Sequence, residues 1–167
     1  MSREPLIRIE RAGDIPSVRA VLTAAFGGEQ EADMIDALRA RGELVLALVA
    51  TGEAGAILGY VAFPRLALTI GGRVIPVVGL APTGVAPEHQ RRGIGSALIR
   101  AGIARLKDDG EPLMFVVGDP QYYRRFGFEV VNGFVSPYAG PYFQTLKLAP
   151  DAPDSGRVVY PSPFADL

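Results

Sequence analysis

Cysteine and tryptophan are absent from this chain of 167 residues, and histidine occurs once, as His89. The lack of cysteine excludes a disulfide, a cysteine-ligated zinc ion and a thiol nucleophile. A single histidine cannot supply a multi-histidine metal cluster, so no metal site is expected. No Gly-x-Ser-x-Gly elbow accompanies His89 to indicate a Ser-His-Asp hydrolase. These absences argue against a covalent enzyme intermediate and favour direct transfer between two bound reactants.

An excess of charge of either sign is also missing, as is any long hydrophobic run. Lys and Arg number 17 against 18 Asp and Glu, a formal net charge of −1. A nucleic-acid-binding protein normally has a large basic excess, so nucleic acid is not an expected partner. The longest apolar stretches, residues 44–50 and 54–63, are too short to span a bilayer. With its polar first residues, the chain is expected to be cytoplasmic and not membrane-bound.

The most informative segment lies where an apolar run gives way to a helical pattern. It consists of Gln90, Arg91, Arg92, Gly93, Ile94, Gly95 and Ser96. The two glycines have no Cβ and let a ligand approach the backbone closely. The first amides of the following helix have no intrahelical partner, and the two arginines add positive charge beside them. The segment predicts a pyrophosphate-binding turn, although it is neither a dinucleotide fingerprint nor a Walker loop.

Two motifs in the chain resemble those of the GNAT superfamily of N-acetyltransferases. Residues 85–98 are similar to its motif A, Gln/Arg-x-x-Gly-x-Gly/Ala. Residues 118–128 are similar to its motif B, in which a tyrosine stands four residues before Gly-Phe. The motifs and their flanking elements cover about residues 6–148, with 149–167 as a C-terminal extension of one domain spanning 1–167. The resemblance implies acetyl-CoA as the cosubstrate and a primary amine as the acceptor.

Hydrophobic periodicity predicts a mixed α/β domain with helices on both faces of a twisted sheet. Gly71-Gly72 predicts a hairpin turn, and Asp14 is a candidate N-cap for the first helix. Strands are expected at 6–10, 44–51, 56–70, 73–78, 111–117, 129–134, 144–148 and 157–160, and helices at 14–26, 29–41, 94–107 and 122–126.

Residues 79–85 have a strand-like but broken pattern, because Pro82 lacks an amide donor and Gly79 and Gly84 weaken regular pairing. The segment is either an edge strand or a bulge with free backbone groups. The GNAT resemblance implies a mostly antiparallel sheet in which this strand is splayed from a parallel neighbour, with the pantetheine arm in the gap. It then implies cofactor contacts from the backbone at Thr83, Gly84 and Val85.

Tyr123 occupies the motif B tyrosine position. A phenol has a pKa near 10 against about 8.5 for a thiol, so it stays protonated at neutral pH and can protonate a departing thiolate. We therefore expect Tyr123 to be catalytic, whereas Tyr122 would face another direction and pack or touch the cofactor. Asp119 stands where the family often has asparagine, and is either a contact for the cofactor amide or only a helix cap.

The general base is less evident, because residues 73–85 contain no acid. Glu29, between the first two helices, is a candidate; an amine that arrives neutral or loses its proton through water is the alternative. The aromatic residues Tyr138, Tyr142 and Phe143 either line an acceptor slot, favouring an apolar or aromatic amine over a polyanion, or belong to ordinary packing.

The acceptor is a small molecule or a peptide amine, between which the sequence does not discriminate. A non-catalytic acyl-CoA-binding module is the rival hypothesis, and an unrelated nucleotide-phosphate binder is a third. Apolar edge strands are compatible with a homodimer.

Overall fold

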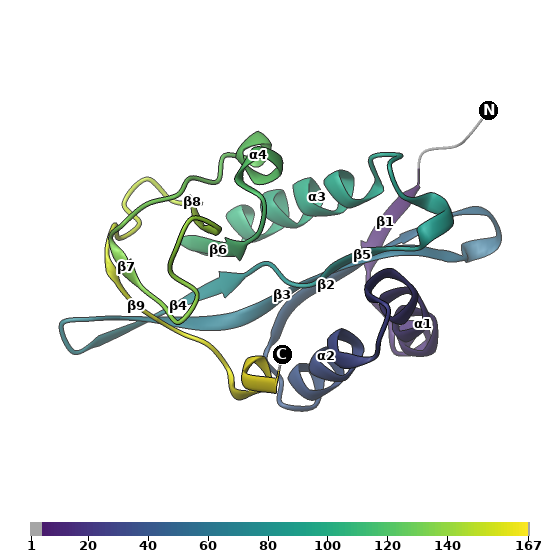
Figure 1. Cartoon of the computed structure of the whole chain (residues 1–167), viewed down its shortest axis with the longest axis horizontal. Helices are drawn as coiled ribbons and strands as arrows, with labels where there is room; N and C mark the ends of the chain where they lie inside the picture. The colour runs from purple at the N-terminus through teal and green to yellow at the C-terminus, as the bar shows by residue number, and fades with distance from the viewer. Residues whose placement is uncertain (1–4, 167) are drawn as a thin grey trace.

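A computed structural model describes residues 5–166, and within them nine strands form one mixed sheet with the central order β1-β2-β3-β4-β6-β8 (Figure 1). The strands are β1 (Leu6–Ile9), β2 (Leu44–Thr51), β3 (Ile57–Ile70), β4 (Arg73–Gly79), β5 (Thr83–Val85), β6 (Leu113–Val117), β7 (Phe134–Val135), β8 (Phe143–Lys147) and β9 (Gly156–Val159). The helices are α1 (Ile15–Phe26), α2 (Gln30–Ala40), α3 (Ile94–Asp108) and α4 (Pro120–Tyr123), the last continued by a 3₁₀ turn over Arg124–Phe126. The expected α/β class, with a mostly antiparallel sheet, is confirmed.

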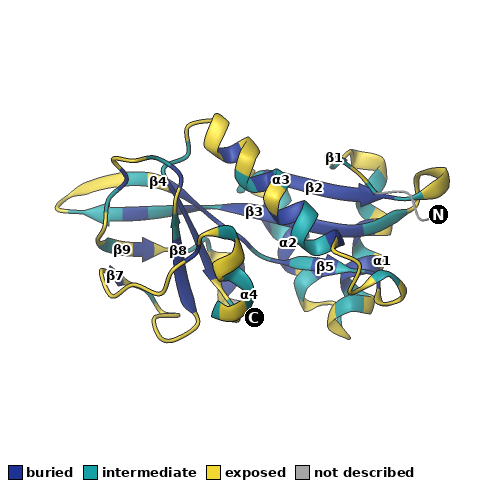
Figure 2. Ribbon diagram, turned by 90° about the horizontal axis from the view of Figure 1, so that it is seen from above, coloured by how far each residue is buried: buried dark blue, intermediate teal, exposed yellow. Residues whose placement is uncertain are grey.

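Helices cover both faces of the sheet, with α1 and α2 on one side and α3 and α4 on the other (Figure 1). Apolar residues at helical spacing bury one side of α3, including Ile94, Leu98, Ile99 and Leu106. The central strands are buried while the outer surfaces of the helices are exposed (Figure 2). Because a Cβ on Gly102 would overlap the ring of Phe63, a glycine at that position is needed for α3 to lie this close to the sheet.

The long strand β3 organises the sheet. Its first half pairs with β2 and β5, and its second half pairs with β4 and β9. The predicted hairpin is present, with Gly71 and Gly72 at φ 51° and 81° between the paired residues Ile70 and Arg73. Positive φ at both central positions is the requirement of a type I′ turn, which explains the glycine pair.

A β-bulge separates β4 from β5. Val78 pairs with Arg65 and Thr83 with Val61, so five steps along one strand oppose four along β3. Beyond this extra residue the chain stays with β3 and leaves its parallel neighbour: β4 pairs with β6 only at Val78 and Gly79. The broken pattern of residues 79–85 therefore corresponds to a bulge that opens a gap between β5 and β6.

Two local expectations differ from the structure. Residues 129–133 form no strand and make one isolated bridge, between Glu129 and Thr145. Asp14 makes no side-chain bond to the first turn of α1; its carboxylate instead accepts bonds from Arg8 and from the Arg11 amide, because a 3₁₀ turn precedes the helix. The strand expected at 157–160 is present as β9, and Phe164 beyond it packs in the core beneath α2. No helix among residues 5–166 is long and apolar enough to cross a membrane.

Candidate active site

A cavity of about 580 Å³ lies at the start of α3, between this helix, β5 and α4. Of the residues predicted from the sequence, nine line it. They are Thr83, Val85, Gln90, Arg91, Gly93, Ile94, Gly95, Ser96 and Tyr123. The fold thus brings motif A and motif B together around one space, although they are separated by a whole helix and strand.

The turn before α3 is held in an unusual backbone conformation. Arg91 has φ 65° and Gly93 has φ 81°, and the Gln90 side-chain amide donates to the carbonyl oxygen of Val85 at 2.9 Å. No side chain caps α3, so its first amides keep their donors for another partner. These amides, the positive end of the helix dipole and the cation of Arg91 together make a site suited to a phosphate group.

Strand β5 forms the opposite wall. Ala62 N donates to Pro82 O and Ala86 N to Leu58 O, so by antiparallel alternation the backbone groups of Thr83 and Val85 point away from β3 and into the gap. The hydroxyl of Thr83 is buried without a partner. The Val85 carbonyl already accepts from Gln90, so the groups left for a ligand with amide groups are the Thr83 hydroxyl, the Thr83 backbone and the Val85 amide.

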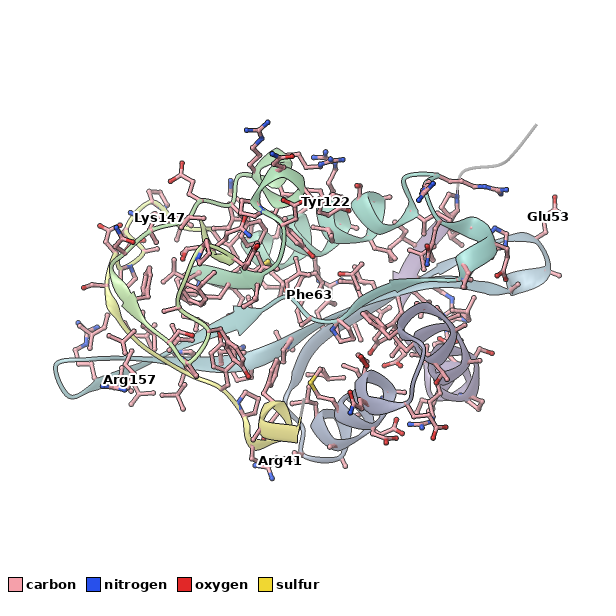
Figure 3. All side chains as sticks on the ribbon, viewed as in Figure 1. Arg41, Glu53, Phe63, Tyr122, Lys147 and Arg157 are labelled. Atoms are coloured by element: carbon pink, nitrogen blue, oxygen red, sulfur yellow. The ribbon has the colours of Figure 1, made fainter. Side chains whose placement is uncertain are left out.

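Tyr122 and Ser96 meet across the cavity. Their hydroxyl oxygens are 3.0 Å apart, and the guanidinium of Arg125 lies 4.4 Å from the centre of the Tyr122 ring. Figure 3 labels Tyr122 on the side of the molecule that carries α3 and α4. The hydroxyl pair fixes α4 against the first turn of α3 and so sets the width of the cavity.

Tyr123 has the most altered environment of the cavity residues. Its ring packs edge-on against Tyr122 and Phe128, and a Cβ on Gly118 would overlap it. Burial, with a smaller contribution from Tyr122, raises the pKa of Tyr123 to about 12. A raised pKa means that the phenol keeps its proton more firmly than a solvated tyrosine.

Four predicted residues do not line this cavity. Gly84 faces α1, where a Cβ would lie 2.9 Å from Leu22 Cδ2. Arg92 lines a neighbouring hollow beside Glu53, which shares His89 and Ile94 with this cavity. Asp119 is exposed, and its carboxylate accepts a hydrogen bond from Gln121 N at 2.9 Å. Of the two roles expected for Asp119, this contact corresponds to the helix cap. Glu29 is also exposed, 3.8 Å from Arg19, and lines neither this cavity nor the one described next.

The cavity also contains four residues outside the predicted set, His89, Ile99, Tyr122 and Arg125. Arg125 lies within motif B, next to Arg124, and its charge alone does not connect it with motif A. His89 lies in the 3₁₀ turn Pro87–His89, where the sequence gives no sign of a cavity.

A second, smaller cavity of about 190 Å³ lies where β4 and β6 part. Its walls include Leu80 and Val116 at the gap, and Tyr138, Tyr160 and Phe164. Among the three aromatic candidates from the sequence, only Tyr138 is in it. Tyr142 is 60% exposed, and Phe143 is buried and stacks on Phe115 in the core.

The arrangement matches a known family. A model of the acetyltransferase (GNAT) domain matches residues 7–131. The chain belongs to the GNAT family of acetyltransferases. The bulged β4–β5 segment, the splayed β6 and the glycine turn before α3 are thus features of a GNAT domain.

Relatives in this family match over most of their length. The uncharacterized N-acetyltransferase YhbS of Escherichia coli K12 is 35% identical over 151 residues, 88% of this chain and 89% of that protein. The crystal structure of YhbS from Escherichia coli in complex with CoA has a TM-score of 0.90 at 33% identity, covering 99% of this chain and 94% of that one. A GNAT acetyltransferase from Brucella melitensis, in complex with acetyl-CoA, has a TM-score of 0.82 at 39% identity, covering 96% and 97%.

Proposed function

We propose that this protein is an N-acetyltransferase that moves the acetyl group of acetyl-CoA directly to a primary amine while both are bound. The observation that supports this most is the convergence of the phosphate-binding turn, the free edge of β5 and a buried tyrosine on one cavity. Two similar GNAT structures were crystallised with CoA or acetyl-CoA. Acetyl-CoA supplies the activated acetyl thioester; binding and proton transfer fall to the protein.

The residues of the cavity fit coenzyme A. The amides of Gly93 to Ser96 and the guanidinium of Arg91 would hold the pyrophosphate, since anions are stabilised at helix N-termini. The backbone of Thr83 and Val85, with the orphaned Thr83 hydroxyl, would pair with the pantetheine amides. The backbone of Gly84 pairs with Tyr60 of β3 and does not face the gap, so Gly84, like Arg92 and Asp119, stays a prediction with weaker geometric support.

Tyr123 is the proposed acid. Its hydroxyl keeps its proton at neutral pH because burial raises its pKa to about 12, and a departing thiolate with a pKa near 8.5 would take that proton. Correct placement of the ring depends on Gly118, which leaves room for it. The phenol therefore combines a retained proton with a fixed position.

The acceptor amine must lose a proton, and no carboxylate of the described side chains lines either cavity. Glu29 remains a candidate general base, but its exposed side chain faces Arg19 rather than either cavity. We favour an amine that binds in its neutral form. On this view Glu29→Gln leaves the pH dependence of kcat/KM unchanged.

The decisive experiment is Tyr123→Phe, with release of free coenzyme A as the assay. We expect kcat to fall at least about tenfold, because general acid catalysis contributes roughly that much or more. The Kd of acetyl-CoA, measured by calorimetry, should change less than about twofold, because the phosphate and pantetheine contacts persist. Tyr142→Phe, at an exposed residue outside both cavities, is the matched control.

An unchanged kcat in Tyr123→Phe would remove that residue from the mechanism. Acetyl-CoA binding without release of coenzyme A for any amine would instead support the rival, a non-catalytic acyl-CoA-binding module. In the wild-type protein, loss of the Tyr123 proton should reduce kcat only at pH values above about 11. The reason is that burial raises the pKa of this phenol above its ordinary value.

A further inference from the structure

The cavity at the parting of β4 and β6 adjoins a wider hollow of about 660 Å³. The two spaces share Tyr138, Tyr160 and Phe164 in their walls. Together they are called the channel below; its inner end is the gap between the strands, where Leu80 N still bonds Phe115 O at 2.9 Å before the strands separate.

The channel lies on the side of the gap away from the phosphate-binding turn. The C-terminal segment that carries Tyr160 and Phe164 runs below the sheet beside α2, whereas α3 and α4 lie above it (Figure 1). Side chains of Thr83 and Val85 face α3: a Cβ placed on Gly95 would lie 3.8 and 3.7 Å from their methyl carbons. A molecule in the channel would thus reach the gap from the opposite side to coenzyme A.

The shared wall is a chain of aromatic rings. Tyr138 and Tyr160 meet edge to face with centroids 4.8 Å apart, and Tyr160 and Phe164 are tilted at 5.3 Å. Such contacts hold the rings in place and present apolar surface to the channel.

Charge is nearly absent from this channel. No charged side chain lines the smaller cavity, and Arg157 is the single charged residue lining the wider hollow among the residues that the structure describes. An alkylammonium ion has a pKa near 10 and would enter this space charged, and no carboxylate lines the space among the side chains of residues 5–165. An amine of low pKa would enter neutral and lose nothing by burial.

We propose that the acceptor is a weakly basic primary amine with an aromatic body, that is, an arylamine, bound against Tyr138, Tyr160 and Phe164 with its nitrogen at the gap. This inference rests on the proposed acetyltransferase activity and names its substrate class. In the transfer, the amine nitrogen forms a bond to the acetyl carbon as the carbon–sulfur bond breaks. The thiolate takes the Tyr123 proton, and the surplus proton on nitrogen passes to water, from which Tyr123 is reprotonated.

The test uses the purified full-length protein, saturating acetyl-CoA and release of coenzyme A. The probes are 4-ethylaniline, 1,4-diaminobutane and a glutamate-rich peptide with a free N-terminus. We expect kcat/KM for 4-ethylaniline to exceed kcat/KM for each of the other two probes at least about tenfold. Only 4-ethylaniline enters the channel uncharged, whereas the other two would bury a charge that needs a partner. Its kcat/KM should also be constant between about pH 6 and pH 9, since an arylamine does not titrate there.

Variants test the aromatic wall itself. Phe164→Ala and Tyr138→Ala should each raise the KM for 4-ethylaniline about tenfold, with kcat within about threefold, because they remove apolar contact and not the reacting groups. Tyr138 is 37% exposed, so its variant is expected to fold even if loss of the more buried Phe164 does not permit folding. Tyr142→Ala is the matched control and should leave KM unchanged.

A preference for the diamine or the acidic peptide, or an unchanged KM in both wall variants, would overturn the inference while leaving the acetyltransferase proposal intact. Failure of the protein to bind acetyl-CoA in calorimetry is a different result, because it would refute the proposed function itself.

Discussion

The two cavities differ in what they are made of. The proposed cofactor cavity at the start of α3 consists largely of backbone: a turn with positive φ at Arg91 and Gly93, uncapped helix amides, and the edge of β5 that faces away from β3. The proposed acceptor channel consists of side chains, above all three aromatic rings contributed by segments near the C-terminal end.

This difference has a physical consequence. A cradle of amides is set by chain direction and glycine positions, so many side chains around it can change without altering it. Two structures with 33% and 39% identity to this chain were crystallised with CoA and acetyl-CoA. They agree with a cofactor site that tolerates changes in the surrounding side chains. An aromatic wall is remodelled by a single substitution, so the acceptor side is where one member of the fold can differ from another.

The largest expected effect is on kcat, and it tests the close approach of the backbone to the Tyr123 ring. In Gly118→Ala the new methyl group overlaps the Tyr123 ring, which must move. We expect kcat to fall about 100-fold, because a displacement of about 1 Å costs that much, and the free energy of unfolding to fall by about 1–3 kcal/mol through overpacking. Coenzyme A release and urea denaturation are the measurements.

The control for Gly118→Ala is Gly13→Ala, where a Cβ meets nothing within 4 Å. If both variants kept wild-type kcat, close approach of backbone and ring would not be required, and the contrast between the two cavities would lose its support.

A smaller effect, on the affinity for acetyl-CoA, is expected to distinguish two neighbouring arginines. Arg91 lines the cofactor cavity at φ 65°, whereas Arg92 lines another hollow. Arg91→Gly removes the guanidinium without backbone strain and should raise the Kd of acetyl-CoA about tenfold, the size of one charge-assisted contact. Arg92→Ala should change that Kd less than about twofold, and added salt should shrink the Arg91 effect. Equal effects would favour the sequence-based assignment of both arginines over the cavity geometry.

The cavity formed mainly by backbone was also the one that could be predicted from the sequence. Glycine and proline report backbone conformation directly, so the turn at Gly93, the hairpin at Gly71-Gly72 and the interruption at Pro82 were predictable before the structure. The resemblance of motifs A and B to the GNAT superfamily implied the family, the fold and the splayed strand pair, and these are confirmed.

The acceptor side was not predictable in the same way. Tyr138 lies on a different segment from Tyr160 and Phe164, and it meets Tyr160 only through tertiary packing. Local pattern also failed at residues 129–133, where an apolar run suggested a strand but the structure has one isolated bridge. Glu29 was selected by chain position between two helices, and position alone does not fix where a side chain points.

The smallest expected effect is on the affinity for acetyl-CoA, and it comes from the hydroxyl pair at the start of α3. Tyr122→Phe removes the bond between the Tyr122 and Ser96 hydroxyls, 3.0 Å apart, and keeps the ring under Arg125. It should raise the Kd of acetyl-CoA about threefold and lower the free energy of unfolding by about 1 kcal/mol. Ser96→Ala closes a double-mutant cycle in urea denaturation, with a coupling of about 1 kcal/mol expected for groups in contact. If Tyr122→Phe weakened binding as much as Arg91→Gly, the cofactor cavity would depend on its side chains as strongly as the acceptor channel does, and the division between them would not hold.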